Sequence, residues 1–307
     1  MVTYPSDWKI SYIDKIADIT TGCRDVKDSV VNGKYPFYVR SKDLERINFY
    51  DFDCEAVLTA GDGGAGKIFH YKNGKFAAHQ RVYVISRFEE VDGKYFYYFF
   101  SKNFLKEVEK YTAKSTVDSV RRPMIANMEF PLPTLKEQQA IASALSDFDE
   151  HIDNLTELIE KKKAVRDGAL NDLVSGKARL DGFDGEWEEK SLKNLGVVLT
   201  GLTYSPDNIR PTGKLVIRSS NIQEDRLVFE GNVFVERSCV KSENVKKGDI
   251  IICVRNGSSA LIGKSAYVTS DLDATFGAFM SNFRCENIQH SAFVYYYTKS
   301  MGFKNFV

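Results

Sequence analysis

Hydrophobic positions along the chain follow two spacings, and the longest regular run lies in the middle of the sequence. Its apolar residues are spaced in alternating steps of four and three: Ile141, Leu145, Phe148, Ile152, Leu155 and Ile159. This heptad spacing is typical of a coiled-coil seam. It predicts a helix whose seam packs against another helix. An amphipathic helix that lies on its own domain is the alternative.

Signals for the two ends of this helix are present in the sequence. Thr134 and Glu137 follow Pro133 with the spacing of a capping box, which marks a helix start. Gly176 is a natural residue for the C-terminal end. About 40 residues lie between these signals, and as one helix they would span roughly 60 Å.

On both sides of the helix, apolar residues occur in short runs rich in β-branched and aromatic residues, separated by Gly or Asn. The strand-like runs are residues 36–41, 55–62, 76–86, 214–219, 249–256 and 279–286. After Lys67 we expect two strand-like runs, separated by a turn at Lys72-Asn73-Gly74. A helical stretch is predicted around residues 94–110, with a counterpart late in the second half.

The two halves resemble each other when the chain is laid on itself. Four landmarks recur in the same order: Trp8 and Trp187, Arg40-Ser41 and Arg218-Ser219, Gly66-Lys67 and Gly263-Lys264, and residues 95–102 and 292–299. The sequence therefore predicts an α+β protein with two repeated mixed α/β domains, separated by a long spacer helix of the coiled-coil type. The predicted boundaries are residues 1–131, 132–178 and 179–307.

Composition narrows the class of protein. Hydrophobic residues make up 43% and charged residues 27%, as in soluble globular proteins. No apolar run approaches the ~20 residues of a membrane span, and the first residues lack the pattern of a signal peptide. The five cysteines are scattered and the four histidines do not cluster with them. We therefore expect a cytoplasmic protein without disulfides, a metal or another cofactor.

A glycine-rich segment, Gly61 to Lys67, resembles a phosphate-binding loop but has Ile68 where Ser or Thr belongs. Such a loop must lead into a helix, whereas strand-like residues follow here. A second copy spans Gly257 to Ser265. The segment is therefore predicted to be a turn between strands. The sequence also lacks the Pro-Pro dipeptide that the motif of adenine methyltransferases contains. The nearest fragment of a nuclease motif, Glu188-Glu189-Lys190, fits a solvated edge better than a metal-binding site.

The chain resembles the specificity subunits of type I restriction-modification systems. The resemblance lies in FPLPTLKEQQAIASAL (residues 130–145), LVSGKARL (residues 173–180) and WKISYIDKIADITTG (residues 8–22), together with the repeat. It implies two target-recognition domains, each reading one half of a bipartite double-stranded DNA target. It further implies that the helices dock methyltransferase subunits, which in turn bind restriction subunits. Catalysis would then belong to those partners, and this chain would not be an enzyme.

One feature departs from the family pattern. Full members carry a second Pro-Leu-Pro junction and a second long helix, whereas this sequence stops at Val307 within the helical stretch of the second copy. We therefore expect an incomplete second domain, and a seam covered by another copy of the chain or by a separate half-subunit. A truncated assembly or silent-cassette version, without competent recognition, is the alternative function.

The formal net charge is zero, so contacts with DNA must come from local patches. Arg and Lys neutralise phosphates, and Arg, Asn and Gln contact base edges. The candidate DNA contacts at strand ends and loops are Arg40, Ser41, Lys42, Lys67, His79, Gln80, Arg81, Lys114, Thr116, Arg121, Arg218, Ser219, Asn221, Arg255, Asn256 and Lys264. For each of them, a solvated strand end without a DNA contact is the alternative.

Overall fold

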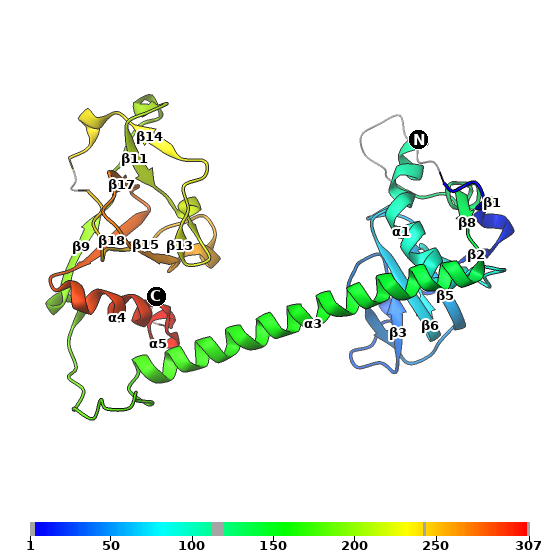
Figure 1. Cartoon of the computed structure of the whole chain (residues 1–307), viewed down its shortest axis with the longest axis horizontal. Coiled ribbons are helices and arrows are strands. Elements are labelled where there is room, and N and C mark those ends of the chain that lie inside the picture. The colour runs from blue at the N-terminus through cyan, green and yellow to red at the C-terminus, as the bar shows by residue number, and fades with distance from the viewer. Residues whose placement is uncertain (1–3, 112–118, 242–243, 306–307) are drawn as a thin grey trace. The chain divides into compact units, whose positions relative to one another are not determined.

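The computed structural model of the chain describes residues 4–111, 119–241 and 244–305. The chain divides into two compact units, Met1–Thr156 and Glu157–Val307. The first unit runs from blue to green and the second from green to red in Figure 1. We call them the first unit and the second unit.

The first unit is built on a six-stranded sheet with the strand order β2-β7-β5-β6-β3-β4. The strands are β2 (Asp18–Thr21), β3 (Tyr35–Tyr38), β4 (Glu45–Ile47), β5 (Phe52–Ala60), β6 (Phe69–Ala78) and β7 (Val82–Ser86). All neighbours are antiparallel except β3 and β6, which run parallel. A separate antiparallel pair joins β1 (Lys9–Tyr12) to β8 (Glu129–Leu132).

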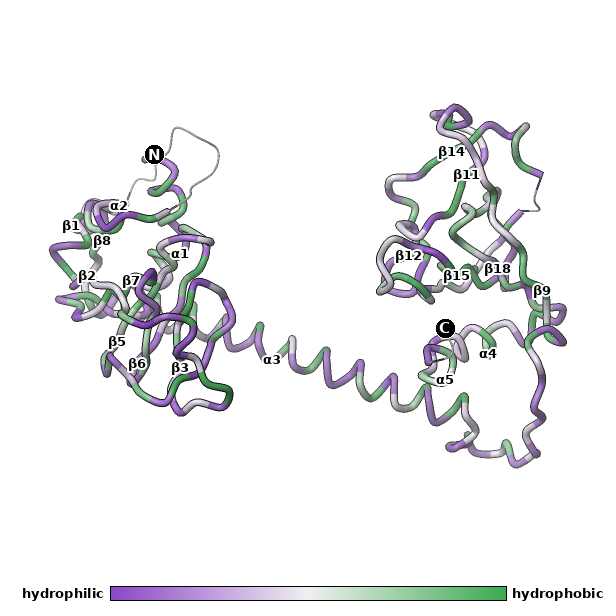
Figure 2. The backbone as a smooth tube through the Cα atoms, turned by 180° about the vertical axis from the view of Figure 1, so that it is seen from behind, coloured by the Kyte–Doolittle hydropathy of each residue, from purple (hydrophilic) through white to green (hydrophobic). Residues whose placement is uncertain are grey.

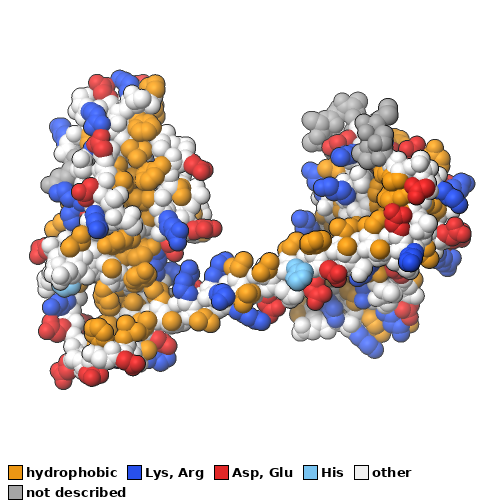
Figure 3. Space-filling view, in the orientation of Figure 1, with side chains coloured by type: hydrophobic (Ala, Val, Ile, Leu, Met, Phe, Trp, Pro, Cys, Tyr) orange, Lys and Arg blue, Asp and Glu red, His pale blue; other side chains and the backbone are white. Residues whose placement is uncertain are grey.

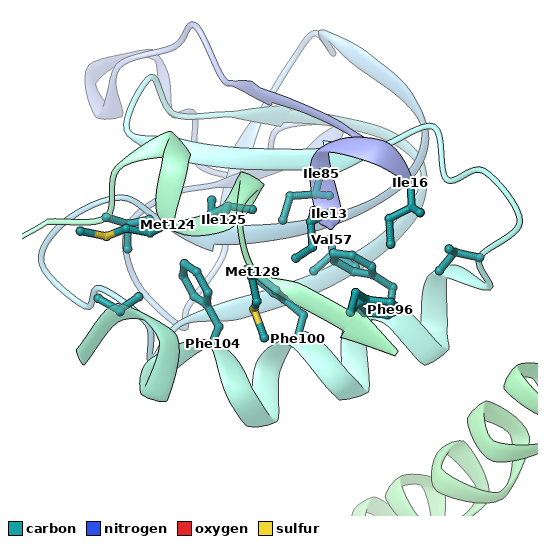
Figure 4. Packing of buried hydrophobic residues seen from close by; sticks show 14 of the residues in the cluster. Ile13, Ile16, Val57, Ile85, Phe96, Phe100, Phe104, Met124, Ile125 and Met128 are labelled. Atoms are coloured by element: carbon teal, nitrogen blue, oxygen red, sulfur yellow. The ribbon is translucent and has the colours of Figure 1, made fainter. Parts of the chain in front are cut away.

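Helix α1 (Gly93–Lys110) supplies four of the five buried aromatic side chains in the main hydrophobic cluster of the first unit. Asp92 caps it by accepting a hydrogen bond from the Tyr95 backbone N–H at 2.9 Å. Phe96, Phe100 and Phe104 recur every four residues, so they lie on one face of the helix and stack on one another. Figure 4 shows this row packed against the isoleucine and methionine side chains, some of them from the short helix α2 (Arg122–Ala126).

The second unit contains two four-stranded sheets and a two-stranded pair. The sheets are β16-β15-β18-β9 and β10-β14-β11-β17, and the pair is β12-β13. The strands are β9 (Gly196–Thr200), β10 (Ile209–Arg210), β11 (Lys214–Ile217), β12 (Ile222–Gln223), β13 (Arg226–Leu227), β14 (Val233–Val235), β15 (Ile250–Cys253), β16 (Ser265–Tyr267), β17 (Ala274–Phe276) and β18 (Met280–Cys285). Helices α4 (Ile288–Lys299) and α5 (Met301–Lys304) follow.

The strand pairing shows that the two units repeat one topology. The order β2-β7-β5-β6 in the first unit matches β9-β18-β15-β16 in the second. The parallel contact of β3 with the end of β6 matches that of β11 with β17. In the first unit a single long strand, β6, therefore makes the pairings that β16 and β17 make separately in the second unit.

This correspondence corrects the turn predicted at Lys72-Asn73-Gly74. In the structure β6 runs through these residues, and its register with β5 continues from Phe76 to Phe69 without a break. Pairing along the whole of β5 outweighs the local turn preference, and Gly74 takes up a φ of 103° within the strand. The turn in the first unit lies later, where the Val82 N–H donates to the His79 carbonyl at 2.8 Å.

Helix α3 (Leu135–Val174) is the long helix predicted from the heptad spacing, and it is 40 residues long. Thr134 Oγ1 accepts from the Glu137 N–H at 3.3 Å, as the capping box requires. At the other end Gly176 adopts a φ of 73°, where a residue with a side chain is strained. The α+β class with one long helix between two repeated domains is thus confirmed.

The middle of α3 is exposed to solvent along its whole circumference. Every residue from 147 to 169 is exposed. Apolar members of the seam remain visible as green segments in Figure 2 and as orange patches in Figure 3. Phe148, Ile152 and Leu155 are 66%, 61% and 59% exposed, which is unusual for side chains of this size.

The first unit holds the N-terminal part of α3, and the buried residue in that contact is Gln138. Its side chain is 1% exposed. Its Nε2 donates to the Glu90 carbonyl at 3.2 Å and to the Pro133 carbonyl at 3.0 Å. Its Oε1 accepts from the Asp92 N–H at 2.9 Å. One amide therefore ties the first turn of α3 to the residues that start α1.

Candidate nucleic-acid interface

The glycine-rich segment of the first unit is the loop of a β-hairpin. It connects β5 to β6, which pair directly on either side of it, Thr59 opposite Phe69. Gly66 has a φ of 70°, and an added Cβ would lie 3.2 Å from the Leu105 backbone, so glycine is required on both counts. The strand that follows confirms that this loop does not lead into a helix and is not a phosphate-binding loop.

Two arginines from different strand ends converge on one carboxylate at the start of this loop. Arg40 Nη1 lies 3.0 Å from Asp62 Oδ1, and Arg81 Nη1 lies 2.6 Å from Asp62 Oδ2. Both guanidinium groups are partly exposed, with 40% and 61% of the side-chain area accessible. We call Arg40, Asp62 and Arg81 the first-unit cluster.

The ionisation of Asp62 keeps this cluster assembled. Desolvation alone would raise the pKa of its carboxyl, but hydrogen bonds from Arg81 and Arg40 outweigh it and lower that pKa. The carboxylate is therefore ionised at neutral pH and neutralises one of the two positive charges. The cluster presents two oriented guanidinium forks with a net charge of about one, which suits contacts with phosphates or base edges.

The second unit brings the matching positions together with different side chains. Asn256 lies three residues after β15, near the position that Asp62 has after β5, and its Nδ2 donates to Ser219 Oγ at 3.1 Å. Arg218 Nη2 donates to the Gly231 carbonyl at 3.1 Å. Arg218 Nε is buried and has no hydrogen-bond partner among the residues that the structure describes. We call Arg218, Ser219 and Asn256 the second-unit cluster.

An open cavity of about 570 Å³ adjoins the second-unit cluster. Arg218 and Ser219 contribute its polar wall, while Tyr204 and Phe279 are among its aromatic lining residues. Phe279 is 56% exposed, although it follows a buried strand. Hydrogen-bond donors beside an accessible aromatic surface are the chemistry with which proteins contact unpaired bases and sugar edges.

The glycine turn recurs in the second unit, between β15 and β16. Gly263 has a φ of 82°, close to that of Gly66. The flanking strands pair in the same way, with Ile252 opposite Ser265. The loop in between is longer, and it includes Arg255, which is exposed. The two units therefore share the glycine turn and differ at the loop tip.

Two of the predicted DNA contacts are buried and already engaged inside their units. His79 is 4% exposed, and its Nδ1 accepts from the Arg81 N–H at 3.0 Å. Asn221 is 0% exposed, and its side chain bonds to the Arg218 N–H and to the Val228 carbonyl. The structure gives both side chains a role in holding a turn, and we remove them from the candidate surface.

The remaining candidates fall into three groups. Lys114 and Thr116 lie outside the described residues. The exposed ones are Lys42, Lys67, Gln80, Arg121 and Arg255. Ser41 and Lys264 are partly buried, and Ser41 Oγ donates to the Asp43 carbonyl at 2.7 Å. The two clusters thus gather Arg40 with Arg81 and Arg218 with Ser219 and Asn256, whereas Arg121 belongs to a different segment.

Reasoning from sequence missed three features of these surfaces. Asp62 was not a candidate, because an acidic residue repels DNA unless arginines surround it. Tyr204 and Phe279 were not singled out, because aromatic residues are frequent throughout the chain. Arg24 was also missed; it forms an ion pair with Asp51 and lies 4.2 Å from the centre of the Phe49 ring. The Gly-Asp dipeptide after a strand was the available signal for Asp62.

Other kinds of site find little support within the described ranges. Their His, Cys, Asp and Glu side chains form no group of three or more able to hold a metal ion. No helix in the same ranges is long and apolar enough to cross a membrane.

Comparison with known proteins places the chain in one family. The family model for the type I restriction modification DNA specificity domain matches residues 5–163, and the chain belongs to this family. The match covers the first unit together with the first part of α3.

Particular relatives are specificity subunits of type I restriction enzymes. The chain is 32% identical over 162 residues to the EcoDI specificity subunit of Escherichia coli, which covers 52% of this chain and 34% of the relative. It is 25% identical over 276 residues to the MjaVIII specificity subunit of Methanocaldococcus jannaschii, covering 81% of this chain and 64% of the relative. The matched region is thus about a third of the first relative and less than two thirds of the second.

Solved structures share the fold over nearly the whole chain. The crystal structure of a type I S subunit from M. genitalium aligns with a TM-score of 0.59 and 20% identity, covering 99% of this chain and 80% of that one. A chain from a structural study of assembly and conformational transition in a type I system aligns with the same TM-score of 0.59 and 13% identity. At these identities the likeness establishes the common architecture.

Proposed function

We propose that this chain is a DNA-reading subunit of a type I restriction-modification complex, with each unit contacting one half of a bipartite target. The observation that carries the proposal is the recurrence, in a member of the specificity family, of one arrangement in both units. In each, a member of an Arg-Ser strand end is hydrogen-bonded to a residue near the start of the glycine hairpin loop, Arg40 to Asp62 and Ser219 to Asn256. This arrangement presents oriented donors at a loop tip, where groove contacts are made.

The two clusters would then read DNA in different ways. In the first unit, Arg40 and Arg81 are positive and fixed in direction by Asp62, so they suit phosphates and guanine edges. In the second unit, Asn256 and Ser219 are neutral and suit hydrogen bonds to base edges, with Arg218 beside them. Two unlike readers imply an asymmetric target. Lys67 and Lys264, in matching turns, would contribute phosphate contacts that are independent of sequence.

We further propose that α3 docks the partner subunits. Its exposed seam, Leu145, Phe148, Ile152, Leu155 and Ile159, has the spacing at which another helix packs. The partners in the proposal are a second helix, from another copy of this chain or a half-subunit, and the methyltransferase subunits, which would bring restriction subunits with them. Adenine methylation and DNA cleavage would be carried out by those partners.

Co-expression with type I methyltransferase subunits, followed by sequencing of methylated bases in the host genome, tests the proposal. A methylated motif in two halves separated by a fixed gap is the expected result. Exchanging residues 254–264 for another loop should then change one half of the motif and leave the other intact. A change in both halves would contradict separate reading by the two units.

The same experiment separates the alternative function. If the chain co-purifies with methyltransferase subunits and no motif is methylated, it acts in assembly without recognition. Light scattering of the purified chain tests the seam: we expect a species larger than a monomer that becomes monomeric when Ile152 and Leu155 are both replaced by Lys. A stable monomer of the unaltered chain would contradict pairing through the seam.

A further inference from the structure

One turn in each unit is built by the same hydrogen bonds. In the first unit the Val82 N–H donates to the His79 carbonyl at 2.8 Å. In the second unit the Met280 N–H donates to the Gly277 carbonyl, also at 2.8 Å. The N–H groups of His79 and Gly277 donate in turn to the last residue of the parallel strand, β3 or β11, both at 2.9 Å. Gly277 therefore occupies in the second unit the position of His79 in the first.

The tips of the two turns carry different side chains. The Arg81 carbonyl accepts from the Gly61 N–H at 2.8 Å, and the Phe279 carbonyl accepts from the Val254 N–H at 3.0 Å. Gly61 and Val254 are the first residues after β5 and β15, so Arg81 and Phe279 correspond as well. The first unit thus carries at this tip a guanidinium group of its cluster, whereas the second unit carries an aromatic residue that is 56% exposed.

Gly277 leaves space where the first unit has a buried side chain. His79 is 4% exposed, and its Nδ1 accepts from the Arg81 N–H at 3.0 Å. The backbone does not require glycine at position 277, because its φ lies outside the left-handed region. An added Cβ would meet its nearest neighbour beyond the adjacent residues, Val216, at 3.7 Å, which is an ordinary contact. The glycine therefore matters for the space it leaves and not for its backbone conformation.

The space at Gly277 belongs to the open cavity of about 570 Å³ beside the second-unit cluster. Phe279, Arg218 and Ser219 line the same cavity. Ser219 Oγ accepts from Asn256 Nδ2, so its own hydroxyl hydrogen can be donated to a ligand. Arg218 Nε has no hydrogen-bond partner among the described residues. The cavity therefore combines an exposed aromatic ring with two hydrogen-bond donors that remain for a ligand.

We propose that this cavity receives one nucleobase that leaves the stack of the DNA half-site read by the second unit. The proposal rests on the DNA-reading function proposed above. The base stacks on Phe279, and carbonyl oxygens on its edge accept from Arg218 and Ser219. Taking a base out of the stack costs free energy, which stacking on an aromatic side chain and hydrogen bonds to the base edge offset. The base is held without modification, since the sequence lacks the motif of adenine methyltransferases.

The lining of the cavity favours a base over other occupants. Among its lining residues Arg218 alone is charged, so a phosphate would find one cation and gain nothing from Phe279. An apolar molecule would leave both donors unpaired. Thymine carries two carbonyl oxygens, whereas adenine presents an amino donor beside its ring-nitrogen acceptors. We therefore expect the cavity to prefer thymine to adenine.

Binding of labelled DNA to the purified full chain, measured by fluorescence anisotropy, tests the proposal. The probes are an oligothymidine of about sixteen nucleotides, its paired duplex, and the same duplex with one central thymine–thymine mismatch. An unpaired base leaves the stack at lower cost than a paired one. The mismatched duplex and the single strand should therefore bind about tenfold more tightly than the paired duplex. Oligothymidine should bind more tightly than an oligodeoxyadenosine of equal length.

Two variants locate this binding in the cavity. Gly277→His introduces the side chain that the first unit carries at the same position, so the turn can accept it, and it should remove the preference for the mismatch. Phe279→Ala removes the stacking surface and should weaken single-strand binding about tenfold. Tyr296→Ala removes an exposed ring on α4 outside the cavity and should leave all three affinities unchanged. Circular dichroism checks that each variant is folded.

Equal binding of the mismatched and paired duplexes overturns the proposal, and so does a preference that Gly277→His leaves intact. The methylation experiment measures recognition separately. A methylated motif in two halves, together with no preference for the mismatch, would leave the proposed function standing without the cavity. A preference that depends on Gly277, in a complex that methylates no motif, would support the cavity and contradict sequence-specific recognition.

Discussion

The two units share a strand topology, and they differ at the loop tips and in how far the aromatic residues of α1 and α4 are buried. The strand order, the parallel contact and the left-handed glycine recur. The first-unit cluster, however, joins two arginines to a carboxylate, whereas the second-unit cluster combines Arg218 with neutral groups; Phe96 on α1 is buried, whereas Phe293 on α4 is 46% exposed. Sheet pairing constrains every residue in a ladder, whereas a hairpin tip constrains little beyond its glycine. Residues at the loop tips can therefore change without changing the fold.

The largest effect on stability is expected from removing the side chain of Phe130, which covers the aromatic face of α1. Phe130→Ala deletes a fully buried ring from the centre of the cluster on α1, and it should lower the free energy of unfolding of the first unit by about 3–5 kcal/mol. Urea titration of a Trp187→Phe background, in which Trp8 alone reports, measures this change.

The matched control is Phe293→Ala in a Trp8→Phe background. Because its ring is about half exposed, the free energy of unfolding of the second unit should change by less than about 1 kcal/mol. Similar losses in both variants would show that α4 is covered as well as α1, and would remove the asymmetry between the units.

A smaller loss is expected from the amide that anchors α3. Gln138→Ala leaves the partly buried Asp92 N–H without its acceptor and two carbonyls without their donor. The unfolding free energy of the first unit should fall by about 1–3 kcal/mol. Gln139→Ala, at the exposed neighbouring position, should be neutral in the same urea titration. Equal stability of the two variants would contradict an anchoring role for Gln138.

The charge difference between the two loop tips can be tested by one substitution in each, Asp62→Asn and Asn256→Asp. Asp62→Asn removes the carboxylate that neutralises one arginine, so affinity for random duplex DNA should rise, and its logarithmic salt slope should steepen by about one. Asn256→Asp should act in the opposite direction. Filter binding at several salt concentrations measures both slopes. Unchanged slopes in both variants would mean that neither loop tip lies near phosphates.

The smallest expected effect is a pH dependence of the free energy of unfolding, mainly that of the first unit. Burial lowers the pKa of His70, and burial together with Arg40 lowers that of His79. Because each imidazole titrates below its unfolded value of about 6.5, stability is complete above that pH. It is lost as the pH falls through the folded-state pKa values. His151 and His290 are exposed. Urea midpoints at pH 7.5 and pH 5 should therefore differ more for Trp8 than for Trp187, and His70→Gln should narrow the difference.

Sequence reasoning succeeded where the governing interactions are local or periodic. The cap at Thr134, the glycine at 176 and the heptad spacing between them located α3 from end to end, because helix limits depend on neighbouring residues. It failed at Lys72-Asn73-Gly74, since pairing with β5 overrides the turn preference there. It also missed Asp62 and Gln138, whose partners in other elements are 19 to 48 residues away and are known only from the folded chain.

The solvent-exposed apolar residues in the middle of α3 have a consequence for the amount of this protein that a cell retains. Apolar side chains at 66% and 61% exposure, on a helix that nothing in the same chain shields among its described residues, are the kind of surface that chaperones and proteases select. If α3 docks partner subunits as proposed, molecules made in excess of those partners would be removed, and those already assembled would be spared. The steady level of the chain would then follow the supply of its partners rather than its own rate of synthesis.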